Sequence, residues 1–280
     1  MAKVNPDFFV QTGDYVYYDK PGPVANTLPK ARHKWHAMNG WPSLINFFRQ
    51  TPTYLIKDDH DLLSDDAHPE TEDYGRLSYA AGLKIWQENA PLVTHPYRTF
   101  RWGKDLQMWL LEGREYRSAN PLPDGPTKTI LGEQQKTWLD STLSASDATF
   151  KIVISATPVV GPDRKNKTDN HANQAFQTEG QWLRNTLASV DHTYVINGDR
   201  HWQYVSQDST TALLEFGSGP VSDAHVQGWN EGPQPEHRYL NLIGGFLGVT
   251  VDRPFGKPTL TFTHYNVRGE AQHTERFVAD

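Results

Sequence analysis

The chain has no cysteine among its 280 residues. Disulfides, thiolate zinc sites and cysteine nucleophiles are therefore excluded. The same absence leaves the redox state of the compartment open, because there is no thiol to be oxidised or kept reduced. Blocks of lysine or arginine are also lacking and the net charge is −6, so the charge pattern indicates neither a nucleic acid nor an anionic membrane as a partner.

Long apolar runs are missing as well. The longest, near 152–160, is far shorter than a bilayer span. No basic segment followed by an apolar stretch opens the chain, so the sequence indicates no signal peptide and leaves the localisation undetermined. An apparent strand begins within a few residues of Met1, and this abrupt start predicts that an upstream segment is missing.

The chain does contain a repeated arrangement of short apolar runs that end in polar clusters. Such runs, rich in β-branched and aromatic residues, predict buried strands at 8–10, 54–56, 108–111, 152–154 and 194–196. Amphipathic patterns predict helices over 30–49 (broken at 40–42), 78–89, 132–143 and 176–189. Strand patterns dominate from 213 onwards. We therefore predict one mixed α/β domain over 1–280, with two sheets packed together.

The polar clusters at the strand ends are expected to meet, because open α/β sheets bind ligands at the carboxyl ends of their strands. That edge would collect Asp14, the Asp-Asp-His-Asp segment at 58–61, Asp199 and His201. So many carboxylates in one place would repel one another unless cations were bound between them. The pattern therefore predicts a hydrolytic centre with two metal ions.

Each motif by itself allows a plainer interpretation. Gly-Asp after a strand is commonly a turn, Asp58 and Asp59 could cap a helix, and His201 could lie at the edge of the core. Tyr17 could be a packing aromatic or, as a phenolate, a ligand of ferric iron. The coincidence of three such motifs after predicted strands is what favours a metal site.

Three arginines also allow two interpretations. Arg114 and Arg117 follow the predicted strand at 108–111, and Arg200 lies between two candidate ligands. Each could hold a phosphate by bidentate pairing, or it could form an ion pair with a nearby carboxylate. Spacing alone does not decide between the two.

The polar loop over 161–173 follows a predicted strand directly and could fold over a site at the strand ends. Its central triplet could contact a substrate or cap the next helix; it consists of Asp169, Asn170 and His171. No GxSxG or GxxxxGK[ST] motif occurs, so a serine nucleophile and a P-loop lack sequence support.

The motifs resemble those of the PhoD (alkaline phosphatase D) family of calcineurin-like metallophosphoesterases. The family motif G-D-x-x-Y matches 13–17, D-D-H-[DE] matches 58–61, and G-D-x-H-W matches 198–202. The segments at 131–139 and 151–161 also resemble the family. The resemblance covers nearly the whole chain.

The resemblance implies an αββα sandwich with a metal site at the strand ends. It implies a phosphomonoesterase or phosphodiesterase that uses a metal-bound hydroxide at a dinuclear centre on a small phosphate ester, with Fe³⁺ and Ca²⁺ as the ions. The implied metal ligands are Asp14, Tyr17, Asp59, Asp199 and His201. His60 is implied as the transition-state histidine. To these we add Arg114 and Arg200 as predicted catalytic residues, and the triplet Asp169, Asn170 and His171 as predicted substrate contacts.

The chain departs from the family pattern at its start. The family normally has an N-terminal β domain and a cysteine iron ligand upstream of G-D-x-x-Y, whereas twelve residues precede Gly13 here and cysteine is absent. Two alternatives therefore stand beside the phosphoester hydrolase. One is a non-catalytic or degenerate domain with an incomplete metal site, and the other is a metal-dependent hydrolase of a different ester. The sequence leaves the oligomeric state and the physiological substrate open.

Overall fold

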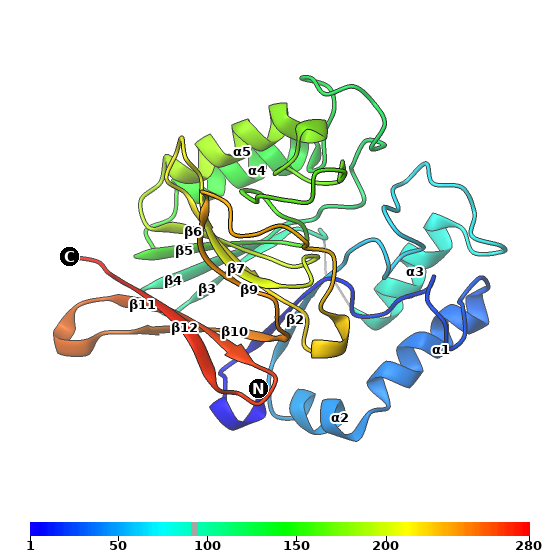
Figure 1. The fold of residues 1–280 in the computed structure, drawn as a ribbon, viewed down its shortest axis with the longest axis horizontal. Coiled ribbons are helices and arrows are strands. Elements are labelled where there is room, and N and C mark those ends of the chain that lie inside the picture. The colour runs from blue at the N-terminus through cyan, green and yellow to red at the C-terminus, as the bar shows by residue number, and fades with distance from the viewer. Residues whose placement is uncertain (91–94) are drawn as a thin grey trace.

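The computed structural model describes residues 1–90 and 95–280. Within these ranges, five α-helices occupy two sides of a pair of sheet layers (Figure 1): α1 (Leu28–Asn39), α2 (Pro42–Phe48), α3 (Tyr79–Asn89), α4 (Gly132–Ser144) and α5 (Gln177–Ala188). The same ranges contain short 3₁₀ helices at η1 (Ala2–Val4), η2 (Gln174–Phe176), η3 (Asp223–His225) and η4 (Pro254–Gly256). Over the described ranges, no helix has the length and apolar character that a membrane span requires.

The larger sheet has seven strands, β3 (Arg98–Trp102), β4 (Leu106–Leu110), β5 (Phe150–Ser155), β6 (Thr193–Asn197), β7 (Gln203–Gln207), β8 (Leu214–Ser218) and β9 (His237–Asn241). Their order is β3-β4-β5-β6-β8-β7-β9. β4, β5, β6 and β8 pair in parallel, whereas β3, β7 and β9 pair antiparallel with their neighbours. Four strands therefore end at the same edge of the sheet.

The second layer consists of two separately hydrogen-bonded pieces. β1 (Phe9–Thr12) and β2 (Thr53–Ile56) form a parallel pair, and β10 (Gly245–Asp252), β11 (Thr259–Asn266) and β12 (Ala271–Val278) form an antiparallel sheet. Both pieces pack on the larger sheet, because Ile56 of β2 and Phe262 of β11 belong to the same buried cluster as Ile154 of β5. This shared cluster is the core of the domain.

The helices complete the sandwich through their apolar faces. Leu139 of α4 and Leu183 of α5 are buried in one cluster with Val153 of β5, on the opposite face of the larger sheet from the second layer. Trp35 of α1 and Ile85 of α3 lie in another cluster with the segment that follows β2. The result is the αββα arrangement that the sequence analysis predicted.

Most predicted elements are confirmed, including the break at 40–42, since α1 ends at Asn39 and α2 begins at Pro42. Three strands were missed: β3, β7 and β9. Their sequences are RTFRW, QYVSQ and HRYLN, and none contains the continuous apolar run on which the prediction relied. β7 is nevertheless buried over four of its five residues. The buried amide of Gln203 is satisfied, because its Nε2 donates to the carbonyl of Tyr265 at 2.8 Å.

Candidate metal centre

Two Gly-Asp turns position carboxylates at the centre of the domain. Gly13 follows β1 at φ 100° and Gly198 follows β6. A Cβ on Gly13 would lie 2.7 Å from the Cβ of Asp58, and a Cβ on Gly198 would lie 2.3 Å from the carbonyl oxygen of Thr12. Only glycine fits this close approach of the strands. The turns that follow them are tight enough to bring both aspartates toward one point between the two sheets.

The aspartates themselves have left-handed backbones. Asp14 has φ 56° and Asp199 has φ 59°, a region that aspartate tolerates better than most residues and that often occurs at functional sites. Asp61 supports the first turn, because its carboxylate accepts from the backbone nitrogens of Asp14 (2.9 Å), Val16 (2.9 Å) and Asp58 (3.0 Å). One buried carboxylate thus fixes the loops after β1 and β2 against each other.

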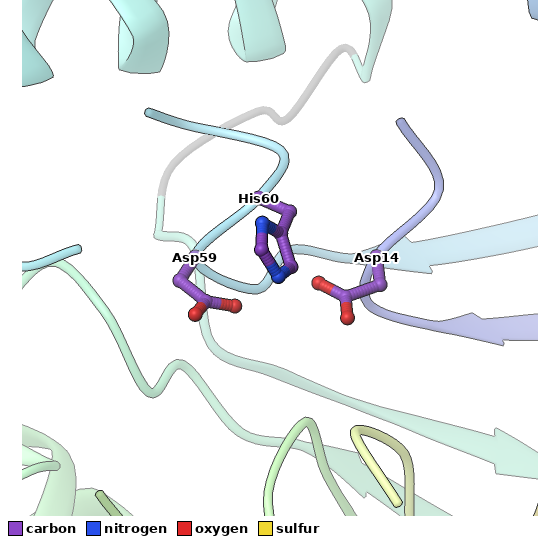
Figure 2. A group of neighbouring side chains, drawn as sticks. All are labelled: Asp14, Asp59 and His60. Carbon is purple, nitrogen blue, oxygen red and sulfur yellow. The ribbon is translucent and has the colours of Figure 1, made fainter. Parts of the chain in front are cut away.

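Five side chains form two overlapping groups that could hold cations. One group is Asp14, Asp59 and His60 (Figure 2), and the other is Asp14, Asp58 and Asp199. Within each group, one ligand atom of every residue lies within 4.8 Å of the others. Asp14 belongs to both groups, which is the arrangement expected of a carboxylate that bridges two ions.

The unpaired oxygens of these carboxylates show that the residues fit a cation. Asp14 Oδ1 and Asp58 Oδ2 are buried and find no hydrogen-bond partner within the described part of the chain. Asp199 Oδ2 lies 2.7 Å from Arg200 Nη1, but without hydrogen-bond alignment. A buried, unpaired carboxylate oxygen is costly in a protein interior. A bound ion would remove this cost at all three residues together.

Electrostatic repulsion in the cluster points the same way. Burial, together with the charges of the neighbouring carboxylates, raises the pKa of Asp14 well above its usual range. Burial is also the main cause that raises the pKa of Asp58 to about 8 and that of Asp199 to about 6. Carboxylates that resist ionisation in this way would be stabilised in their charged form by a cation.

The donor atoms are those that hard cations prefer, namely carboxylate oxygens with one imidazole. Tyr17 adds a phenol at the same place, because its hydroxyl donates to Asp14 Oδ2 at 2.9 Å. Burial and the nearby carboxylates raise its pKa. The geometry brings Tyr17 beside a candidate ligand, and its own role as a ligand stays a prediction.

His60 is held by a carboxylate that the sequence analysis did not single out. Its Nδ1 lies 2.8 Å from Asp19 Oδ1. Burial alone would lower the pKa of His60, but this hydrogen bond and the charges of Asp59 and Asp19 raise it overall. Asp19 therefore sets the orientation of the imidazole and favours its protonated form, next to the carboxylates in Figure 2. No sequence pattern links residues 41 positions apart, so only the fold could identify Asp19.

Arg114 and Arg200 form ion pairs, which is the alternative that the sequence left open for both. Arg114 is buried and its Nε contacts Asp58, with Nη2 3.6 Å from Asp59. Arg200 Nη2 lies 2.6 Å from Asp163 and 3.4 Å from Asp169. Both guanidiniums balance carboxylates of the cluster. A direct contact of either with phosphate stays a prediction, and it would require these ion pairs to rearrange.

The triplet at 169–171 is buried rather than open to a ligand. Asn170 donates to Asp163 at 2.7 Å, and His171 Nε2 lies 2.9 Å from Glu179. The alternative that this triplet caps the next helix is excluded, because Asn173 caps η2 by accepting a hydrogen bond from the nitrogen of Ala175. Internal partners thus occupy the amide of Asn170 and Nε2 of His171, whereas His171 Nδ1 is buried without a hydrogen-bond partner in the described ranges. The role of the triplet as substrate contacts stays a prediction. Asp169 supports the site indirectly through Arg200.

His201 lies beside the centre. Across the described residues, neither candidate group includes it. Its Nδ1 is 3.3 Å from Gln227 Nε2, and its ring centroid is 5.0 Å from that of His225 in η3. Burial lowers its pKa to about 4, so the ring is neutral as a metal ligand must be. The ring centroid of His225 in turn lies 5.2 Å from that of Tyr17. His225 was not singled out in the sequence, and Asp58 was expected in the strand-end cluster but not among the implied metal ligands.

Comparisons with known proteins place the chain among phosphatases by sequence and by fold. A sequence model of PhoD-like phosphatases matches residues 1–245 of the chain. Alkaline phosphatase D of Bacillus subtilis (strain 168) is 22% identical over 319 aligned residues, which cover 90% of this chain and 53% of that protein. The chain thus spans about half the length of this curated relative.

Solved structures share the fold. A structure of PhoD aligns with a TM-score of 0.75 at 16% identity, covering 97% of this chain and 64% of that one. Purple acid phosphatase PPD1 from yellow lupin (Lupinus luteus) seeds aligns with a TM-score of 0.67 at 9% identity, and the alignment covers 99% of this chain and 47% of that one. A dimetal phosphatase from Danio rerio aligns with a TM-score of 0.53 at 14% identity, and the alignment covers 99% of this chain and 85% of that one. At such identities the likeness establishes the fold.

Proposed function

The chain belongs to the PhoD-like phosphatase family, and on this premise we propose that it is a metal-dependent phosphoester hydrolase with a dinuclear centre. One observation carries the proposal. Asp14, Asp58 and Asp199 bring buried carboxylate oxygens within 4.8 Å of one another, and each of these residues has an oxygen without a hydrogen-bond partner in the described chain. Carboxylates in this arrangement would bind cations, and the bound cations would attract an anionic phosphoester.

Cations held there would supply an activated water for in-line attack and would neutralise the phosphoryl oxygens. The chain's own residues supply the remaining roles. His60, oriented by Asp19 and with a raised pKa, is placed to stabilise charge or to donate a proton to the leaving oxygen. Asp61 keeps the loops that carry the ligands in register. Arg114 and Arg200 hold the carboxylates in place through the ion pairs described above.

We propose Fe³⁺ and Ca²⁺ as the ions. The oxygen-rich donor set supports hard cations, and the phenol of Tyr17 beside Asp14 supports a ferric ion in particular. Elemental analysis of the purified protein identifies the ions. A folded protein that takes up neither iron nor calcium when both are supplied would favour a degenerate, non-catalytic domain.

Hydrolysis of bis(p-nitrophenyl) phosphate tests the activity. We expect Asp14→Ala to abolish both metal binding and turnover, because Asp14 belongs to both ligand groups. We expect His60→Ala to lower kcat by about 10²–10⁴. His36→Ala on the exposed side of α1 is the matched control and should behave as the wild type. Wild-type rates in either site variant would contradict the assignment, and turnover of carboxylic esters alone would indicate a different hydrolase.

A further inference from the structure

A cavity of about 660 Å³ opens beside the candidate metal centre. Its walls come from three loops that follow β2, β4 and β5. They include Asp65, Asp66 and His68 from the first loop, Asn120 and Leu122 from the second, and Thr168 from the third. A volume of this size is typical of small-molecule sites. The buried triplet at 169–171 thus has an accessible neighbour in Thr168.

The cavity is joined to the centre through two direct contacts. The backbone nitrogen of Asp66 donates to Asp59 Oδ2 at 2.5 Å, and Asp65 Oδ1 lies 3.6 Å from His60 Nε2. Asp59 and His60 form a candidate ligand group with Asp14. A phosphoester whose phosphorus lies at the centre could therefore extend one of its alcohol groups into the cavity.

The charged side chains that line the cavity are carboxylates. Asp66 Oδ1 is buried and has no hydrogen-bond partner in the described ranges. Besides His60, the neighbouring basic group is Lys167, whose Nζ lies 4.0 Å from Asp65 Oδ2 and 3.7 Å from Asp66 Oδ1 but is shared with Asp169 at 3.5 Å. Burial and the charge of Arg117 lower the pKa of His68, so this ring adds no positive charge near neutral pH.

Resting on the proposed function, we infer that this cavity is a substrate subsite that selects phosphoesters of amino alcohols. An ammonium group would give Asp66 the missing hydrogen-bond partner and would share the charge of Asp65 with Lys167. The side chain of Leu122 would contact the methylene groups. An anionic alcohol group would be repelled by both carboxylates. Asp65 and Asp66 are therefore the specificity-determining residues of the inference.

Two phosphate monoesters of equal size test this inference as competitive inhibitors of bis(p-nitrophenyl) phosphate hydrolysis. Phosphoethanolamine carries an ammonium group where n-propyl phosphate carries a methyl group. We expect the wild-type protein to bind phosphoethanolamine about tenfold more tightly, as one partly screened ion pair would provide. Asp65→Asn and Asp66→Asn should each bring the ratio of the two inhibition constants closer to one. Asp140→Asn, exposed on α4, should keep the wild-type ratio.

Calorimetric titration of the same two esters into the metal-loaded protein measures the ratio without turnover. If the protein binds phosphoethanolamine preferentially but hydrolyses nothing, the subsite stands and the proposed hydrolase fails. If the protein hydrolyses the diester but the two monoesters bind equally, the hydrolase stands and the subsite is wrong. A wild-type preference that persists in both asparagine variants also overturns the subsite, because the selectivity would then come from elsewhere.

Discussion

At the scale of single residues, the orientation of His60 depends on Asp19. We predict that Asp19→Asn lowers kcat about 10–100-fold, as loss of an outer-shell carboxylate typically does. The variant also removes the interaction that raises the pKa of His60, so the imidazole should lose its proton at a lower pH. The pH at which kcat changes should therefore be lower in this variant than in the wild type. Asp19→Glu should recover part of the rate, and an unshifted profile in Asp19→Asn would show that the carboxylate serves only packing.

The backbone of Gly13 lies directly against the side chain of the candidate ligand Asp58. In Gly13→Ala, the new methyl group would collide with Asp58 and the backbone would be strained at φ 100°. We expect a loss of about 1–3 kcal/mol in unfolding free energy together with weaker metal binding. Gly103→Ala is the matched control, since Gly103 has φ 61° but open space around its missing side chain. Gly103→Ala should lower the unfolding free energy by about 1 kcal/mol and leave metal binding unchanged. Equal metal binding in both variants would show that the close contact between Gly13 and Asp58 does not position the ligand.

At the scale of elements, Glu179 joins α5 to the start of α4. Its carboxylate accepts from the backbone nitrogens of Ile130 (2.8 Å) and Leu131 (3.0 Å) and contacts His171. Burial would raise its pKa, but the hydrogen bond and charge of His171 lead the interactions that lower it to about 2. Since this value lies below that of an unfolded glutamate, the stabilisation is complete above about pH 4.3 and is lost as the pH falls toward 2.

Because the folded state lowers the pKa of Glu179, the effect of Glu179→Gln on stability should depend on pH. We expect the variant to be less stable than the wild type by about 1–3 kcal/mol at pH 6, with the difference shrinking between pH 4 and pH 2. Denaturant unfolding across this range measures it. Glu133→Gln, at an exposed position on α4, should show no such change. A difference that stays constant down to pH 2 would mean that shape rather than charge fixes the contact.

The same scale shows what the sequence could predict. Apolar runs located β1, β2, β4, β5 and β6, and the polar residues after β1, β2 and β6 meet as expected because parallel strands end at one edge. The order β6-β8-β7 could not be predicted, since strand pairing depends on contacts distant in sequence. The partners of His60 and Arg114 were undetermined for the same reason. Spacing identified the candidate ligands, but only the fold showed that Arg114 and Arg200 pair with carboxylates.

At the scale of the whole molecule, the acidic centre should govern stability when metals are removed. Asp14 and Asp58 have raised pKa values, about 8 for Asp58, and that of His60 is raised too. The folded metal-free protein therefore binds protons more tightly than the unfolded chain, and its stability falls as the pH rises. Above about pH 6.5, the buried neutral rings of His201 and His264 no longer oppose this trend, because unfolded histidine is then largely neutral as well.

We predict that the melting temperature of the chelated protein falls between pH 6.5 and pH 8, whereas that of the metal-loaded protein changes little. Bound cations would hold the carboxylates ionised and would also stabilise the folded state by mass action. Thermal unfolding at matched ionic strength measures both curves. Asp58→Asn should flatten the curve of the chelated protein. Parallel curves with and without metal would indicate that the ions bind elsewhere.

The two-piece second layer has a consequence for local motion. Asp14 and Asp58 follow the small β1–β2 pair, whereas Asp199 follows β6 of the larger sheet, and the hydrogen-bonded ladders of the described strands keep these two sheets separate. A cation shared by these carboxylates would cross-link the two sheets at their edge. Amide hydrogen exchange should therefore slow most in β1 and β2 on metal binding and least in the central strand β5. The ions would then suppress local opening of the first sixty residues in addition to their part in hydrolysis.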